Sequence, residues 1–201
     1  MAADTTYPNI VQIRQDGNLA VPTGKSIDVE SGAELKIAGT AVTATAAELN
    51  SATDASARVV TVAAATTSLT VTLTEHSEKI IVLNTNNATG CTLTLPVASA
   101  SGARYTIVNN VVQTQGTIII TCGTLDVISG VCRSFDTTAV ATAATCFVTS
   151  ATSDKITMVP DGTQGGEKGD KFVIVDIAAN VYLVEGFVSC TGAKATPFAA
   201  T

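Results

Sequence analysis

A stretch near the N-terminus of the chain repeats every eight residues. It reads Leu19-Ala-Val21-Pro-Thr-Gly24-Lys-Ser-Ile27-Asp-Val29-Glu-Ser-Gly32-Ala-Glu-Leu35-Lys-Ile37-Ala-Gly39. Two sets of apolar residues share the eight-residue spacing, namely Leu19, Ile27 and Leu35, and Val21, Val29 and Ile37. Each unit alternates apolar, polar and apolar residues, so both apolar side chains fall on one face of a short strand, and a glycine supplies the turn. The pattern predicts an octad-repeat β segment over residues 19–43.

The apolar face of this repeat needs a partner, because three thin units bury almost nothing by themselves. We interpret its six apolar residues as the interface of a homotrimer in which three chains wrap around one axis. The alternative is a plain β-meander at the edge of the following domain. The regular register through three units favours the intertwined oligomer.

Residues 1–18 contain one short apolar stretch, Ile10-Val11-Gln12-Ile13, which lies between Pro8 and Gly17. Its alternation predicts a strand, and a lone terminal strand has no stability of its own. We therefore expect residues 1–18 to form an anchoring arm. In this arm Ile10, Val11 and Ile13 would dock on a neighbouring subunit or on another protein.

Residues 44–57 follow the repeat, and their pattern predicts a short helical linker. Thr45 and Glu48 have the spacing of a capping box, in which each side chain hydrogen-bonds a free backbone N–H of the first turn. Ala46, Ala47 and Leu49 favour a helix, and Asn50 and Ser51 end it.

The composition of the chain favours β structure. Apolar residues make up 46% of it, but aromatic residues only 4% and charged residues only 14%, and there is no Trp. Thr and Val dominate with Ala and Gly, and β-branched residues suit strands. Many short strands between turn signals predict a β-sandwich or barrel over residues 58–201. The expected strands are Val59–Ala63, Ser68–Thr74, Lys79–Asn84, Thr92–Leu95, Arg104–Asn109, Thr117–Thr121, Val140–Ser150, Lys155–Pro160, Lys171–Ile177 and Val181–Cys190. Turns are expected at Ser129-Gly130 and elsewhere, with a hairpin turn at Ala178-Ala179-Asn180.

Charge and hydropathy narrow the classes of partner. The formal net charge is −6, and Lys and Arg are scattered, so we expect no nucleic-acid binding. No apolar run approaches the ~20 residues of a membrane-spanning helix, and the N-terminus lacks the pattern of a secretory signal. The five Cys have no metal-binding spacing, and we interpret them as buried free thiols, although a disulfide between two of them stays open.

No set of residues indicates an active site or a cofactor. His76 is the single His and lies where a turn is expected, so we interpret it as a solvated loop residue. Asp161, Glu167 and Asp170 flank the Gly-rich loop and could supply oxygen ligands to Ca²⁺, but a plain surface hairpin is the better interpretation. The loop also lacks the order of a phosphate-binding motif. We therefore expect a protein that is not an enzyme.

The stretch Gly39-Thr-Ala-Val-Thr-Ala-Thr-Ala-Ala-Glu-Leu-Asn50, together with the repeat before it, resembles the shaft-to-head junction of tailed-phage fibre and head-decoration proteins. Lys79–Asn84, Thr92–Pro96, Gly102–Asn110 and Gly116–Ile120 are similar to a β domain of the same proteins, and Tyr182–Gly186 through Thr196–Phe198 fits its closing strands. The likeness begins near residue 17 and covers most of the chain. It implies a trimeric virion surface protein without catalysis.

The length of each part favours one virion role over another. About 18 residues precede a shaft of three repeats, which fits a short peg better than a tail fibre with its own anchoring domain. We therefore expect a protein of the capsid surface, made in the host cytoplasm, that binds the major capsid protein and stabilises the head. A tail-fibre or receptor-binding protein is the alternative.

Overall fold

The computed structural model describes residues 12–13, 19–20, 36–37, 40–41, 58–138 and 144–200. The chain divides into two units, Met1–Leu49 and Asn50–Thr201. The described residues are mostly β, with a single short helix among them, so the all-β prediction is confirmed at the level of secondary structure. We call the described part of the second unit the head.

Two small strand pairs are described in the first unit. Strand β1 (Gln12–Ile13) pairs antiparallel with β2 (Leu19–Ala20), and β3 (Lys36–Ile37) pairs antiparallel with β4 (Thr40–Ala41). Ile13 of the expected arm therefore lies opposite Leu19 of the same chain. The other residues predicted for the arm and the trimer interface lie outside the described residues, and these are Ile10, Val11, Val21, Ile27, Val29 and Leu35.

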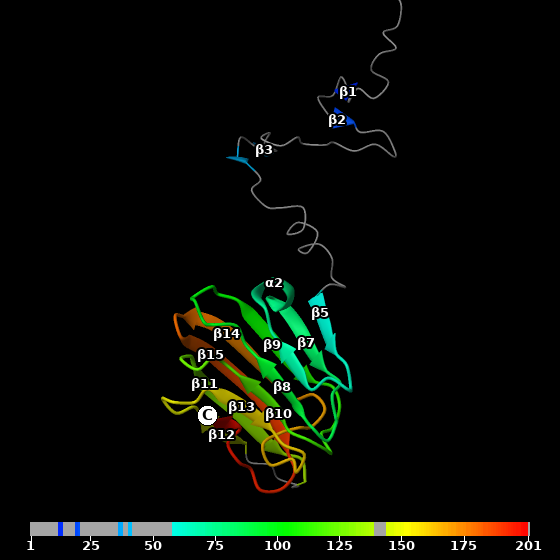
Figure 1. Ribbon diagram of the computed structural model, residues 1–201, viewed down its shortest axis with the longest axis vertical. Helices are drawn as coiled ribbons and strands as arrows, with labels where there is room; N and C mark the ends of the chain where they lie inside the picture. Colours follow the sequence, from blue (N-terminus) through cyan, green and yellow to red (C-terminus); the bar gives the residue numbers. More distant parts are fainter. Residues whose placement is uncertain are drawn as a thin grey trace, which may run out of the picture. The chain divides into compact units, whose positions relative to one another are not determined.

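The head consists of two mixed sheets, which Figure 1 shows one behind the other. The larger has seven strands in the order β12 (Thr145–Val148), β11 (Val127–Asp136), β15 (Val181–Cys190), β14 (Lys171–Ala178), β9 (Arg104–Asn109), β7 (Lys79–Leu83) and β5 (Val59–Val62). The smaller has five strands in the order β16 (Phe198–Ala199), β13 (Lys155–Met158), β10 (Ile118–Thr121), β8 (Cys91–Thr94) and β6 (Ser68–Thr70).

One hairpin lies at the middle of the larger sheet. Strands β14 and β15 pair antiparallel, and Asn180 at their turn has a positive φ of 63°. Asn tolerates this left-handed conformation better than most residues, which explains why the chain turns there. The predicted hairpin is confirmed. On its two sides the hairpin pairs antiparallel with β9 and parallel with β11.

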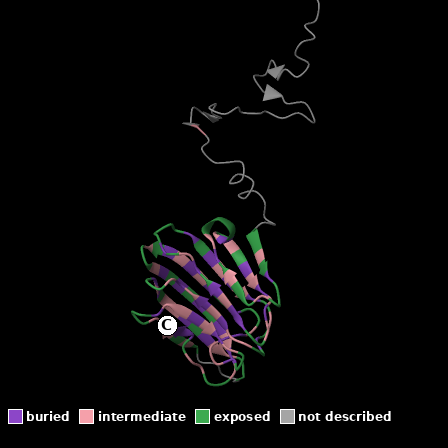
Figure 2. Cartoon of the chain, viewed as in Figure 1, coloured by how far each residue is buried: buried purple, intermediate pink, exposed green. Residues whose placement is uncertain are grey.

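The core is formed by residues that alternate along the strands of both sheets, as the buried and exposed colours of Figure 2 show. Tyr182 is fully buried, and its hydroxyl donates a hydrogen bond of 2.7 Å to the carbonyl of Pro96. The larger sheet contributes Ile81, Leu83, Tyr105, Ile107, Phe172, Ile174 and Val184, and the smaller sheet contributes Leu93, Ile118, Ile120, Ile156 and Met158. The opposite side of each sheet is therefore left as a surface of the head.

Two predicted segments differ from the structure. The strand expected over Ser68–Thr74 ends at Thr70, and helix α2 (Leu73–His76) follows it. Thr72 caps this helix by accepting a hydrogen bond from the Glu75 N–H. The turn expected at Ser129-Gly130 is wrong, because both residues lie inside β11, the long strand that the sequence did not indicate. The predicted linker helix over 44–57 lies outside the described residues.

The environments of His76 and of one Cys also differ from expectation. His76 is buried, not solvated, and its Nδ1 accepts a hydrogen bond of 3.0 Å from the Thr72 N–H. All five Cys are free thiols as interpreted, and four of them are buried, but Cys146 is exposed.

Candidate interaction surface

The side chains of the seven-stranded sheet that point away from the core form a surface that we call the outer face. Strand register places one continuous row of residues on it, from one edge of the sheet to the other. That row is Val59, Ile80, Thr106, Val173, Glu185, Val131 and Val148. The second row, in the same order of strands, is Thr61, Val82, Val108, Lys171, Phe187, Arg133 and Cys146. Most of these residues are apolar.

Several of the large apolar side chains on the outer face are in contact with solvent. The exposed fraction of Ile80 is 42%, of Phe187 45% and of Val148 69%. Isolated apolar residues are normal on a protein surface, but a contiguous apolar patch marks an interaction site. The register makes these residues part of a contiguous surface. The outer face is therefore a candidate interaction surface.

The five-stranded sheet provides an internal comparison, because its solvent side is polar. The residues that alternate with its core positions are Ser68, Thr70, Thr92, Thr94, Ile119, Thr121, Lys155 and Thr157. Threonine has nearly the shape of valine but carries a hydroxyl that hydrogen-bonds water. The two sheets of one domain thus differ in the chemistry that they present to solvent.

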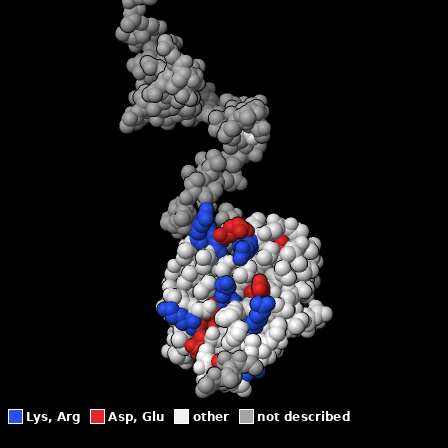
Figure 3. Space-filling view, turned by 180° about the vertical axis from the view of Figure 1, so that it is seen from behind, with Lys and Arg blue, Asp and Glu red and all other residues white. Residues whose placement is uncertain are grey.

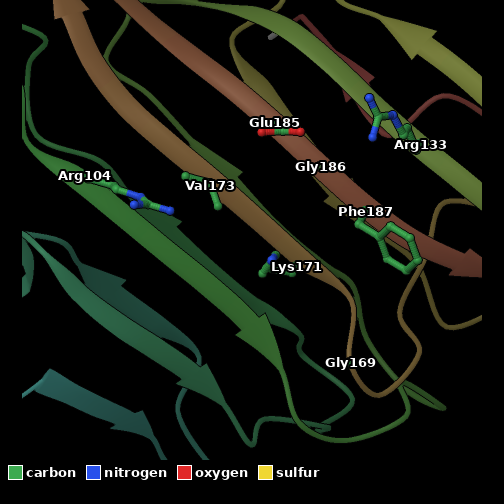
Figure 4. A pocket seen from close by; sticks show the side chains of 8 residues that line it. All are labelled: Arg104, Arg133, Gly169, Lys171, Val173, Glu185, Gly186 and Phe187. Atoms are coloured by element: carbon green, nitrogen blue, oxygen red, sulfur yellow. The ribbon is translucent and has the colours of Figure 1, made fainter.

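A shallow groove of about 480 Å³ lies on the outer face, over the centre of the sheet. It is lined by Arg104, Arg133, Gly169, Lys171, Val173, Glu185, Gly186 and Phe187 (Figure 4). Seen from the side opposite to that of Figure 1, the head shows a few Lys and Arg side chains, with some Asp and Glu side chains next to them, among mostly uncharged atoms (Figure 3). Arg104 comes from β9, Lys171 from β14 and Arg133 from β11, so three cations reach one groove from three strands.

The Gly-rich loop, residues 161–170, lies at the end of the groove near Lys171. The side chain of Asp170 fixes the conformation of this loop by hydrogen bonds. Its buried carboxylate accepts hydrogen bonds from the N–H groups of Gly166 at 2.7 Å, Glu167 at 3.0 Å and Ser189 at 2.7 Å. Burial raises the pKa of Asp170 to about 6, against the effect of these hydrogen bonds. The loop is therefore tied to β15 immediately before β14 begins.

The carboxylates considered for Ca²⁺ do not form a cation site. Asp170 is directed to backbone N–H groups of its own loop, and Asp161 accepts hydrogen bonds from the N–H and the hydroxyl of Thr163, at 2.9 Å and 2.8 Å. Among the described residues, no group of three or more His, Cys, Asp and Glu side chains could hold a metal ion. Within the same residues no helix is long and apolar enough to cross a membrane.

A second buried carboxylate organises the opposite end of β14. Asp176 accepts hydrogen bonds from the N–H groups of Ser99, Ala100 and Ser101, and from the Ser101 hydroxyl at 2.6 Å. Burial alone would raise the pKa of Asp176, but these hydrogen bonds outweigh it and hold the pKa below its usual value. Both ends of β14, which forms the floor of the groove, are therefore fixed by buried carboxylates.

The sequence did not single out the residues of this groove. Arg104 and Lys171 are the first residues of strands that were expected, whereas Arg133 lies in β11, which was not. Comparison of the chain with protein-family models, with curated proteins and with solved structures found no match. The groove and the outer face are thus known from the residues of this chain alone.

Proposed function

We propose that this chain is a structural protein of a tailed-phage particle, which decorates the capsid exterior as a homotrimer, binds the major capsid protein and stabilises the head of the phage. In this proposal the two sheets of the described domain form a β-sandwich carried on an octad-repeat shaft, and residues 1–18 dock on the capsid. The protein has no catalytic role.

The observation that carries the proposal is the apolar outer face, which extends across all seven strands of the larger sheet. A domain that works as a free monomer rarely leaves a contiguous apolar surface in water. A protein that is held in an assembly covers such a surface, and apolar area removed from water stabilises the assembly by roughly 25 cal/mol per Å². The low charge of the whole chain, 14%, supports the same conclusion.

The location and copy number of the protein on the intact particle test the proposal. A decoration protein is expected on the capsid in tens to hundreds of copies, as measured by quantitative mass spectrometry of purified particles and by labelling with antibodies in electron microscopy. A few copies at the tail, or absence from the particle, would overturn the proposal.

The homotrimer is tested separately with the full chain in solution. Multi-angle light scattering is expected to give the mass of three chains. Val29→Asp places a charge on the apolar side of the repeat and should weaken the trimer, whereas Glu30→Lys on the polar side is the matched control and should leave it intact. A stable monomer, or equal effects of the two substitutions, would contradict the intertwined shaft.

A tail-fibre or receptor-binding role is the second candidate, and the cationic groove favours it. Three cations over an apolar sheet could bind an anionic molecule on a host surface. This role predicts that the purified protein binds host cells and blocks infection. The decoration role predicts neither.

A further inference from the structure

The outer face has a charge pattern that restricts what can cover it. Arg104, Arg133 and Lys171 are exposed and line one groove, with Glu185 as the single carboxylate there. No ion pair joins any of these four side chains to another residue of the described part of the chain. The chain as a whole is acidic, with a net charge of −6. Three cations are thus concentrated on the outer face of a chain whose net charge is negative.

The spacing of the cations suits an elongated ligand. Arg104 and Arg133 lie three strand spacings apart, which is about 14 Å across the sheet, and Lys171 lies on a strand between them. In Figure 4 the Arg104 side chain extends from β9 toward β14. This spacing suits an extended chain with several carboxylates better than a single small anion.

The walls of the groove favour a polypeptide over a sugar polymer. Beside the cations and Glu185, the groove is lined by Val173 and Phe187, and Phe187 packs on Phe135 with ring centroids 4.7 Å apart. A sugar ring packs on exposed aromatic faces, and Phe187 is the one aromatic side chain in the lining of this groove. Valine and phenylalanine instead suit apolar side chains that alternate with acidic ones.

Two other occupants fit the charges less well. A second copy that packed the same face against this one would bring three cations against three cations, with only Glu185 on each side to offset them. A nucleic acid would be repelled by the net charge of −6, and three cations are few for a polyanion. The excess of positive charge in the groove therefore favours an acidic surface on another protein.

We propose that the groove over β9, β14, β15 and β11 is a docking site for an extended acidic polypeptide segment whose carboxylates alternate with apolar side chains. Arg104, Lys171 and Arg133 bind the carboxylates, and Val173 and Phe187 contact the apolar side chains. The proposal of this docking site does not rest on the proposed role of the chain in a phage particle.

The test measures binding of the full chain to a labelled eight-residue peptide that alternates glutamate and valine, by fluorescence polarisation. We expect binding that weakens as NaCl rises from about 50 mM to about 500 mM, because salt screens exposed charges. Arg104→Gln, Lys171→Gln and Arg133→Gln should each weaken binding about threefold, and the triple variant about twentyfold. Lys155→Gln removes the same charge from the other sheet and should leave binding unchanged. A peptide that alternates lysine and valine should not bind.

Each contrary result overturns the proposal. Failure of the glutamate–valine peptide to bind, or equal loss in Lys155→Gln and the groove variants, would show that the groove is not the site. Tighter binding of polygalacturonate through the same three residues would assign the groove to an anionic sugar polymer. A change in sedimentation of the triple variant relative to the parent would assign it to a second copy. Thermal unfolding of each variant verifies that the head is folded.

Discussion

Gly186 lies directly beneath the groove, and replacing it with alanine should destabilise the head for a purely steric reason. It is buried in β15, where it pairs with Phe172 of β14 and with Cys132 of β11. A Cβ at this position would lie 2.7 Å from Cδ1 of Phe172 and 2.9 Å from Sγ of Cys132. Both side chains are fully buried, so neither can move into solvent. The added methyl group therefore forces the strands or the ring to shift.

The expected magnitude depends on two opposing effects. Overpacking a filled core costs about 1–3 kcal/mol, and the rigid ring of Phe172 places this substitution near the upper end. Alanine in a strand recovers about 0.5–1 kcal/mol relative to glycine, because the unfolded chain loses less entropy on folding. The net loss in the free energy of unfolding should be about 2 kcal/mol. For a chain of this size that corresponds to a fall in Tm of about 6 °C.

The assay is urea and thermal unfolding of the full chain followed by far-ultraviolet circular dichroism, since the chain contains no Trp. Phe172→Leu removes ring atoms and should relieve the clash, so Gly186→Ala combined with Phe172→Leu should cost less than the sum of the two single changes. A Gly186→Ala variant within about 0.5 kcal/mol of the parent, or strictly additive costs, would refute the steric argument.

Two buried carboxylates and the five thiols give further measurable outcomes. Asp176→Asn should lower the free energy of unfolding by about 2–3 kcal/mol at pH 7, because an amide nitrogen would face the N–H donors of residues 99–101. A loss below about 0.5 kcal/mol in urea unfolding would contradict this expectation. Asp170 has a pKa of about 6 against an ordinary value of about 3.9 in the unfolded chain, so the folded state holds its proton more tightly between these values. Its contribution to the free energy of unfolding should therefore fall by about 2 kcal/mol as pH rises from 4 to 6, and Asp170→Asn should abolish this dependence; parallel pH profiles of parent and variant would be the contrary result. With a maleimide at pH 8, Cys146 should react rapidly in the folded protein, and the other four thiols should react only after unfolding because they are buried. Burial also raises the pKa of one of these four, Cys122, to about 12. A second thiol that reacts rapidly in the folded protein would contradict the burial of these four side chains.

Two strands whose bounds the sequence predicted carry apolar residues at most of their alternate positions. Arg104–Asn109 and Val181–Cys190 have the expected bounds in the structure. Strand β11 was missed because Gly130 interrupts its pattern. Gly130 has a φ of +153°, and a Cβ there would meet the carbonyl oxygen of Val184 on the adjacent strand, so glycine is required by a neighbour far away in sequence. A local pattern cannot reveal that requirement.

Helix α2 and the groove were missed for related reasons. Thr72 begins the helix where the β-branched run of Ser68–Thr74 indicated a strand, because its side chain caps Glu75 N–H and so competes with the strand. The groove depends on Arg104, Arg133 and Lys171, which only the pairing of β9, β14, β15 and β11 brings to one surface. The parallel pairing of β11 with β15 has no signal in either segment.

The contrast between the two sheets bears directly on assembly. Valine and threonine have similar shapes and both favour strands, so strand formation does not explain why the larger sheet presents valine and isoleucine to solvent where the smaller presents threonine. The two residue types differ in their interaction with water. If a partner covers the outer face, Ile80→Thr and Val173→Thr should leave the free energy of unfolding of the head within about 0.5 kcal/mol of the parent but weaken its retention on the particle. A large loss of stability in urea unfolding would show instead that these two side chains are held by packing within the head, and the outer face would then need no partner.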